Sequence, residues 1–188
     1  MLLSHQTHMP VVNNAARSIR RSIADSTHRP HDFERTMQLN YLAPVRLSLA
    51  VLPGMAERGS GHIVNISTLG TQTGSPRFSA YLASKAALEM FTRIAAAEYL
   101  GDGVRFSVVH MPLVRTPMVT ATDAYEQVPA MRPEDAAGLI AEALRTRAEH
   151  VGPAFGQFAE LAHALSPTAT TEALHALFRA TERGMPGA

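Results

Sequence analysis

The 188-residue sequence contains no cysteine. The chain can therefore form no disulfide and offers no thiolate for catalysis. It also lacks any stretch approaching 18 consecutive apolar residues, and its opening Met1 to His8 has no apolar core of the length a signal peptide needs. We accordingly expect a cytoplasmic protein without a transmembrane segment.

An excess of charge of either sign is absent as well. The chain has 17 Lys and Arg against 16 Asp and Glu, for a net charge of +1. This balance gives no electrostatic reason to expect nucleic acid or an anionic membrane as a partner. The chain also has no Gly-x-Ser-x-Gly elbow, which argues against a hydrolase of that type.

Lysine occurs once, at Lys85, while every other basic side chain is arginine. The lysine follows Tyr81 by four positions, and residues so spaced share one face of a helix. The pKa of lysine is tunable, whereas the guanidinium of arginine stays protonated. An ammonium beside a phenol lowers the phenol's pKa by favouring the phenolate. The pair therefore predicts a general acid/base, and the alternative is a surface tyrosine beside a chance lysine.

Predicted strands and helices alternate along the chain, which favours an α/β fold with a parallel sheet wrapped by helices. A length of 188 residues with 46% hydrophobic content suits one domain. We expect strands near 11–14, 62–67 and 104–110. Helices are expected over 33–58, with Asp32 as its N-cap, over 79–100, from Pro133 onward with Ala136 to Leu144 on its apolar face, and over 156–165 and 168–183.

Several motifs resemble the short-chain dehydrogenase/reductase family, from its fourth strand to its end. Asn13-Asn14-Ala15-Ala16 is similar to the family's Asn-Asn-Ala-Gly strand end, and Tyr81-x-x-x-Lys85 matches its signature. The segment Pro112 to Met118 resembles Pro-Gly-x-x-x-Thr, with leucine in place of glycine. The resemblance implies the carboxyl-terminal part of a Rossmann-type doubly wound parallel sheet, lacking the first three strands. We expect domain limits of 1–10 for a disordered lead, 11–155 for the partial reductase domain and 156–188 for a helical extension.

The same resemblance implies a catalytic set. Thirteen residues before Tyr81, the family's usual distance to its catalytic serine, the sequence has Thr68, with Ser67 as the fallback. Asn40 matches the asparagine of the preceding helix. Pro44 lacks the N–H that would bond the carbonyl of Asn40, so we expect a kink there. The free carbonyl would hold a water on a proton path to Lys85, and packing strain around the proline is the alternative.

The implied chemistry is hydride transfer between NADP or NAD and a carbonyl or alcohol carbon. Tyr81 would exchange the proton with the substrate. Lys85 would lower the pKa of Tyr81 and hold the nicotinamide ribose, and Thr68 would hydrogen-bond the substrate oxygen. The residues expected to contact the cofactor are Asn13, Asn14, Ala15, Tyr81, Lys85, Pro112, Val114 and Thr116.

Glycine is missing where the family places its phosphate-binding turn. The first glycine of the chain is Gly54, already past Asn40. Backbone N–H groups of such a turn bind the pyrophosphate, so we expect this polypeptide to bind NADP or NAD poorly. The sequence does not indicate which of the two cofactors is preferred. The first strand would be an exposed edge. A misread gene, a frameshift and a real deletion are all compatible with this absence, and a non-catalytic interaction module is the alternative function.

The runs Arg17 to Ser22 and Met111 to Met118 look like the reductase domain of fatty acyl-coenzyme A reductases, which suggests a long-chain aldehyde or acyl thioester substrate. Apolar residues at helical spacing in the tail would line its pocket or form core, and core is favoured. These residues are Phe155, Phe158, Leu161, Leu174, Leu177 and Phe178. The family also implies a homodimer or tetramer through the helices 33–58 and 79–100.

Metal binding is a weaker hypothesis. His5 and His8, and again His28 and His31, are spaced i, i+3, which metals can use. No cysteine is available and no carboxylate completes a site, so we assign no metal.

Overall fold

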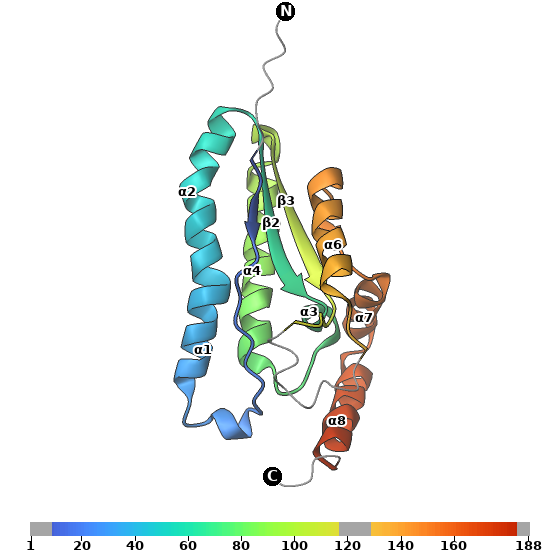
Figure 1. The fold of residues 1–188 in the computed structure, drawn as a ribbon. Helices are drawn as coiled ribbons and strands as arrows, with labels where there is room; N and C mark the ends of the chain where they lie inside the picture. Colours follow the sequence, from blue (N-terminus) through green and yellow to red (C-terminus); the bar gives the residue numbers. More distant parts are fainter. Residues whose placement is uncertain (1–8, 117–128, 184–188) are drawn as a thin grey trace, which may run out of the picture.

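The computed structural model describes residues 9–116 and 129–183. Four parallel strands form one sheet in the order β1 (Val11–Asn13), β2 (Gly61–Thr68), β3 (Val104–Met111) and β4 (His150–Val151). The predicted fold class, part of a doubly wound parallel sheet, is confirmed. Among the described strands β1 pairs with β2 alone, so it forms an edge of the sheet (Figure 1).

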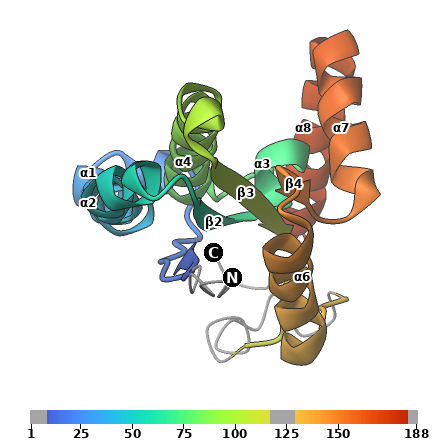
Figure 2. The ribbon, with the colours of Figure 1, turned by 90° about the horizontal axis from the view of Figure 1, so that it is seen from above.

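Helices cover both faces of this sheet. The helices α2 (Ala43–Glu57) and α4 (Ser79–Glu98) lie on one face, and α6 (Pro133–Thr146) lies on the other (Figure 2). β2 and β3 are consequently buried over nearly their whole length, as strands of a sheet covered on both sides must be.

Alternation along the two central strands divides the core in two. Side chains of successive strand residues point to opposite faces. Ile63 and Phe106 pack with Leu52 and Met55 of α2 and with α4. The second cluster joins Val64, Ile66 and Val109 to Ala143 of α6 and Val151 of β4. Odd-numbered residues of β2 therefore face α4, which places Asn65 and Ser67 on that side.

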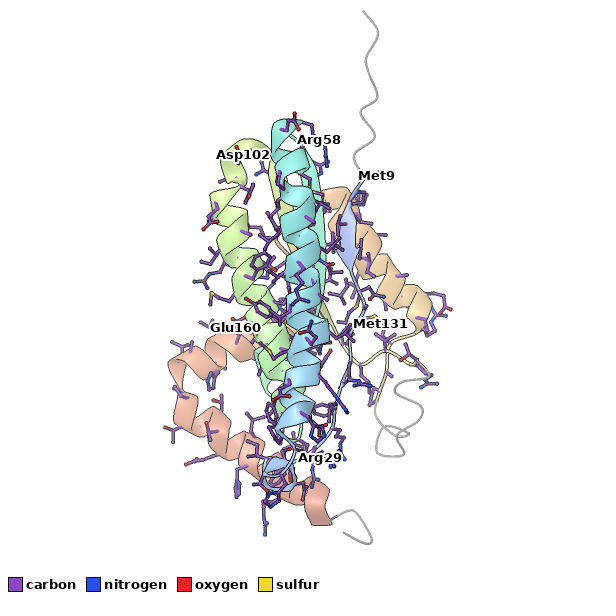
Figure 3. The ribbon with its side chains drawn as sticks, turned by 90° about the vertical axis from the view of Figure 1, so that its left-hand side faces the viewer. Met9, Arg29, Arg58, Asp102, Met131 and Glu160 are labelled. Carbon is purple, nitrogen blue, oxygen red and sulfur yellow. The ribbon has the colours of Figure 1, made fainter. Side chains whose placement is uncertain are left out.

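One long helical rod runs beside α4. It consists of α1 (Pro30–Met37), a π-helical turn η2 (Gln38–Leu42) and α2, and Figure 3 shows it extending from Arg29 to Arg58. The disturbance expected at Pro44 takes the form of this π turn, in which the Ala43 N–H bonds the Gln38 carbonyl. A proline without an N–H is thus accommodated by a wider turn just before it.

The prediction of Asp32 as N-cap is wrong. The helix begins three residues earlier than expected, with Pro30 at its first position and Arg29 as the N-cap. Proline at this position loses no bond, because the first N–H groups of a helix have no partner. The Asp32 carboxylate is instead buried, 3.1 Å from Arg21 and 3.1 Å from Arg29.

The remaining described helices are short or peripheral. They are η1 (Ala24–Ser26), α3 (Gly70–Thr73) after β2, η3 (Leu100–Asp102) after α4, and the pair α7 (Ala154–Leu165) and α8 (Pro167–Arg183). The predicted α6 is confirmed, with Pro133 first and Ala143 fully buried. In 9–116 and 129–183 no helix has the length and apolar character to cross a membrane.

The apolar residues of the tail do not form core, which corrects the expectation from their spacing. Phe155 and Phe158 are 65% and 69% exposed, and Leu161 and Leu177 are exposed as well. Helical spacing predicts a shared face, and here that face of α7 is largely open to solvent in the part of the chain described.

Candidate active site

Tyr81 and Lys85 lie one turn apart in the first half of α4, as predicted. Lys85 is only 2% exposed, and its Nζ donates a hydrogen bond to the Ile66 carbonyl oxygen at 2.6 Å. Burial lowers the pKa of the Lys85 ammonium, and the nearby Glu89 carboxylate offsets part of that effect, which leaves the pKa at about 8. Tyr81 is half-buried. The structure thus places an amine with a lowered pKa one helical turn from a partly exposed phenol.

The two candidate hydroxyls at the end of β2 have different surroundings. Ser67 is 3% exposed, and its Oγ donates to the Glu89 carboxylate on the α4 side of the sheet. Thr68 is the last residue of β2 and half-buried, and its Oγ1 accepts the Gly70 N–H at 3.3 Å. Ser67 is committed to the interior, so the geometry favours Thr68 as the hydroxyl for a substrate oxygen.

Asn40 lies in the π turn and is fully buried. Its Oδ1 accepts the Arg17 N–H at 2.8 Å, while its Nδ2 donates to the Arg17 carbonyl at 2.8 Å and to Ser84 Oγ at 3.0 Å. The Ser84 hydroxyl in turn donates to the Tyr81 carbonyl at 2.6 Å. The Asn40 side chain therefore ties the segment after β1 to the turn of α4 that carries Tyr81. The tie through Ser84 was not predicted from the sequence.

The Asn-Asn-Ala segment divides between interior and surface. The side chain of Asn13 is buried and donates to Asn65 Oδ1 at 2.7 Å, and Asn65 Nδ2 donates to Thr92 Oγ1 of α4 at 2.8 Å. Asn14 and Ala15, just past β1, are exposed. The first asparagine thus anchors the strand, and the next two residues are free to meet a ligand.

The loop after β3 carries the other predicted cofactor contacts. Pro112, Val114 and Thr116 are half-buried, and the Leu69 N–H bonds the Met111 carbonyl at 2.8 Å, which joins this loop to the end of β2. Val114 pairs with Met131 in an isolated bridge. Pro117 and Met118 of the same motif lie outside the described residues.

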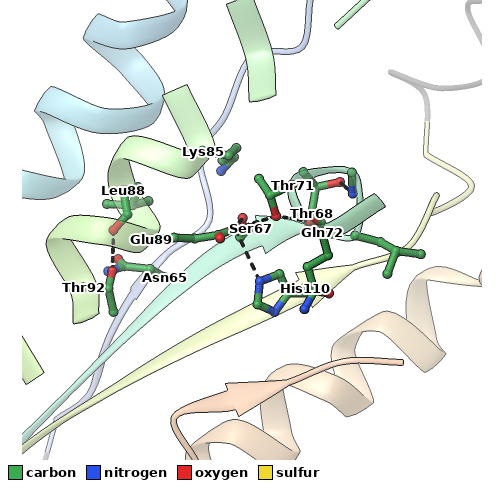
Figure 4. A network of polar contacts seen from close by, with 12 residues as sticks. Asn65, Ser67, Thr68, Thr71, Gln72, Lys85, Leu88, Glu89, Thr92 and His110 are labelled. Carbon is green, nitrogen blue, oxygen red and sulfur yellow. Dashed lines mark hydrogen bonds and ion pairs between the residues drawn. The ribbon is translucent and has the colours of Figure 1, made fainter. Parts of the chain in front are cut away.

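A partly buried polar cluster around Glu89 was missed by sequence reasoning. Glu89 Oε1 accepts from Ser67 and lies 2.7 Å from the Thr71 hydroxyl and 3.4 Å from His110 Nε2, as Figure 4 shows. These partners come from β2, α3 and β3, respectively. The one signal in the sequence is spacing, because Glu89 follows Lys85 by four residues on α4.

A shallow cleft of about 390 Å³ lies between α3, α7 and α8. Its walls include Thr71, Gly74, Phe155, Phe158 and Leu174. As for a metal, the described residues contain no group of three or more His, Cys, Asp or Glu that could hold one. His31 lies 3.3 Å from the Asp32 carboxylate, and His5 and His8 lie outside the described residues.

The parallel sheet and the Tyr81–Lys85 spacing are features of the short-chain dehydrogenase/reductase class, and the comparison with known families agrees. Residues 9–127 match the model of the short chain dehydrogenase family, so the chain belongs to that family. An uncharacterized oxidoreductase of Mycobacterium tuberculosis is 52% identical over 157 residues, which are 84% of this chain and 46% of the relative. A fatty acyl-CoA reductase of Acinetobacter baylyi is 48% identical over 157 residues, or 84% of this chain and 53% of that protein.

Solved structures agree on the fold. A short-chain dehydrogenase from Streptomyces avermitilis matches with a TM-score of 0.71 at 28% identity, covering 95% of this chain and 73% of the other. One from Burkholderia cenocepacia in complex with NADP matches with a TM-score of 0.73 at 24% identity, covering 87% and 67%. The chain spans about half the length of the curated relatives that it matches.

Proposed function

We propose that this sequence carries the proton-transfer half of an NAD(P)-dependent reductase that acts on a long-chain aldehyde or acyl thioester. The observation that carries the proposal is the amine of Lys85, buried one helical turn from Tyr81 with its pKa near 8. The similarity to the fatty acyl-CoA reductase of Acinetobacter baylyi supports the substrate class. NADP or NAD would supply the hydride when bound.

The proton steps belong to residues of this chain. Tyr81 would give its proton to the substrate oxygen as that oxygen gains negative charge. The Lys85 ammonium would stabilise the phenolate left behind, and Thr68 would donate a hydrogen bond to the same substrate oxygen. Proton transfer of this kind contributes about 10² to 10⁴ in rate.

The residues present fit the ribose end of a nicotinamide cofactor. The Lys85 ammonium has three donors, and among the described residues the Ile66 carbonyl takes one of them. Ribose hydroxyls would be suitable acceptors for the others. Asn14, Ala15, Pro112, Val114 and Thr116 would complete this end. Because the sequence offers no glycine-rich turn, we propose that the 188-residue polypeptide alone binds the cofactor weakly, and strong enhancement of NADPH fluorescence by the purified chain would contradict this.

The cleft between α3, α7 and α8 is the place we propose for the alkyl part of the substrate. It lies beside α3, which begins two residues after Thr68, and its aromatic walls at Phe155 and Phe158 suit an alkyl chain.

We also propose self-association through the helices 33–58 and 79–100. Both helices carry exposed large apolar side chains, namely Leu39, Leu47, Leu49, Met90 and Ile94. A second copy of the chain could bury part of this apolar surface.

The experiment that tests the function is a segment exchange. The matching segment of the Acinetobacter baylyi fatty acyl-CoA reductase is replaced by the corresponding part of this sequence, and NADPH oxidation is measured with a long-chain aldehyde and an acyl thioester. Tyr81→Phe deletes only the titrating oxygen, and Lys85→Arg keeps the positive charge but replaces the compact ammonium and its three donors with a larger planar guanidinium. Each should reduce the rate more than tenfold.

Retention of more than about a tenth of the rate by both variants, with their fold intact by circular dichroism, would contradict the proposed roles. A folded exchange protein that is inactive on both substrates would instead favour the alternative, a non-catalytic module. The share of the relatives that this chain spans is the observation that keeps that alternative open.

A further inference from the structure

Glu89 is the most strongly connected ionisable group behind the proposed site. One of its carboxylate oxygens, Oε1, accepts hydrogen bonds from the Ser67 hydroxyl of β2 and the Thr71 hydroxyl of α3. The same oxygen contacts the His110 ring of β3. Three chain segments thus converge on a single oxygen of α4 (Figure 4). A side chain held by partners from three directions has little freedom to move, so its charge stays at one place.

These partners also keep Glu89 ionised. Burial raises the pKa of the Glu89 carboxyl, but hydrogen bonds from His110, Ser67 and Thr71 outweigh burial and leave the pKa below its usual value. The Thr71 hydroxyl is in addition 2.7 Å from the Thr68 carbonyl. The same carboxylate is therefore linked, through Thr71, to the residue that offers the candidate catalytic hydroxyl.

The fixed carboxylate stands one turn from the buried amine. Lys85 and Glu89 are four residues apart on α4, and such residues share a face of the helix. Along α4 the ionisable groups one turn from Lys85 are Tyr81 before it and Glu89 after it, and His110 faces Glu89 from β3. Of these, Glu89 is the group whose charge favours the protonated amine.

We propose that Glu89 is a positioning residue of this site, whose fixed negative charge keeps the buried Lys85 in its cationic form. The proposal deepens the function proposed above, since a neutral Lys85 could not stabilise a Tyr81 phenolate. Burial alone pushes the amine toward neutrality, and Glu89 opposes it. Because the charge acts on Lys85 itself, the effect can be observed without cofactor, substrate or turnover.

The composition of the chain makes this observation direct. Lys85 is the only lysine, so protein labelled with [13Cε]lysine gives one lysine side-chain signal in an NMR spectrum. The chemical shift of that carbon follows the protonation of Nζ, and a titration between about pH 6 and pH 11 yields its pKa. The unsubstituted chain should titrate near 8.

Glu89→Gln preserves shape and acceptor oxygen but removes the charge, and it should lower the Lys85 titration midpoint by about 1 pH unit. Glu89→Asp keeps a carboxylate and should restore most of the difference. Glu98→Gln removes an exposed carboxylate from the same helix and should change nothing. The same midpoint in the unsubstituted chain and in Glu89→Gln would overturn the proposal.

Equal downward shifts in Glu89→Gln and Glu89→Asp would overturn it as well, because the effect would then follow from packing rather than charge. If Glu89→Gln fails to fold, Glu89→Ala takes its place, and an unchanged midpoint in that variant would overturn the proposal. Loss of turnover in the exchange protein would concern the function of Tyr81 and Lys85, and the titration is independent of it.

Discussion

Replacing Lys85 with methionine is expected to stabilise the folded chain at neutral pH and to remove a rise in stability above pH 8. The ordinary pKa of a lysine is 10.5, and burial lowers it to about 8 in the folded chain. Between these two values the unfolded chain binds a proton that the folded chain does not. The free energy of unfolding therefore rises with pH from about 8 to about 10.5, and below 8 the folded state carries the full cost of the buried charge.

The magnitude follows from the size of the pKa difference. Each unit is worth 1.36 kcal/mol, so the cost of the charged amine below pH 8 is about 3 kcal/mol. Methionine has a similar length and no charge, but it loses the hydrogen bond to the Ile66 carbonyl, which is worth about 1 kcal/mol. Lys85→Met should thus be more stable than the unsubstituted chain by about 2 kcal/mol at pH 7, with no advantage left near pH 10.5.

Urea unfolding followed by circular dichroism at pH 7, 8, 9 and 10 measures this difference. Both proteins carry Tyr81→Phe, which removes the phenol that Lys85 would tune, and the contribution of the other tyrosines cancels when the two free energies are subtracted. Arg93→Met removes an exposed cation from the same helix and should give a difference that does not change with pH. A difference between the proteins with and without Lys85→Met that stays constant within about 0.5 kcal/mol from pH 7 to pH 10 would refute the reasoning.

Two further predictions concern stability. Gly103 has φ of 71°, and a Cβ there would lie 2.2 Å from the Gly59 carbonyl oxygen. Gly103→Ala should therefore lower the free energy of unfolding in urea by about 3 kcal/mol. At Gly101 a Cβ meets open space, so Gly101→Ala should lower it by less than about 1 kcal/mol. Burial, with a smaller effect of Arg147, lowers the pKa of His62 to about 4 from 6.5, so stability present above pH 6.5 should fall as the pH approaches 4. His62→Gln should reduce that acid-side loss by about 2 kcal/mol when unfolding is compared at pH 7 and pH 4.5, and an unchanged loss would show that His62 is not its source.

Much of the fold could be predicted because the residues of the buried strands are themselves typical of strands. Two β-prone runs without Gly or Pro suit a sheet covered on both faces, namely Val104 to His110 and Ile63 to Ile66. Both are strands, as expected. The helix from Pro133 was equally plain, since proline and two acids open it.

The errors arose where a neighbouring segment decides the outcome. Asp32 has the character of an N-cap, yet its carboxylate pairs with Arg21 and Arg29 of the preceding segment, and Pro30 starts the helix earlier. In the tail, periodicity identified a shared apolar face on α7 but not what covers it, and Phe158 is exposed. Sequence period indicates which residues point together, and packing depends on where the neighbouring element goes.

For the site, the sequence supplied Tyr81, Lys85 and the candidate Thr68 through spacing, and the structure adds reasons to prefer Thr68 over Ser67. The cluster around Glu89 could not be predicted, because its partners come from three segments that only the folded sheet brings together. Their roles in chemistry remain predictions that the substitutions above address.

The hydrogen bond between Asn13 and Asn65 has a consequence for how β1 finds its place. A strand of three residues gains little from its backbone ladder, and sliding by one residue would turn its side chains to the other face. Asn13 lies directly across from Asn65 in the parallel register, and their amides meet at 2.7 Å in the interior. Any other alignment would bury an amide without a partner, at a cost of about 1 to 3 kcal/mol. This pair therefore sets the register of β1 against β2, and with it the position of the exposed Asn14 and Ala15 at the edge of the sheet.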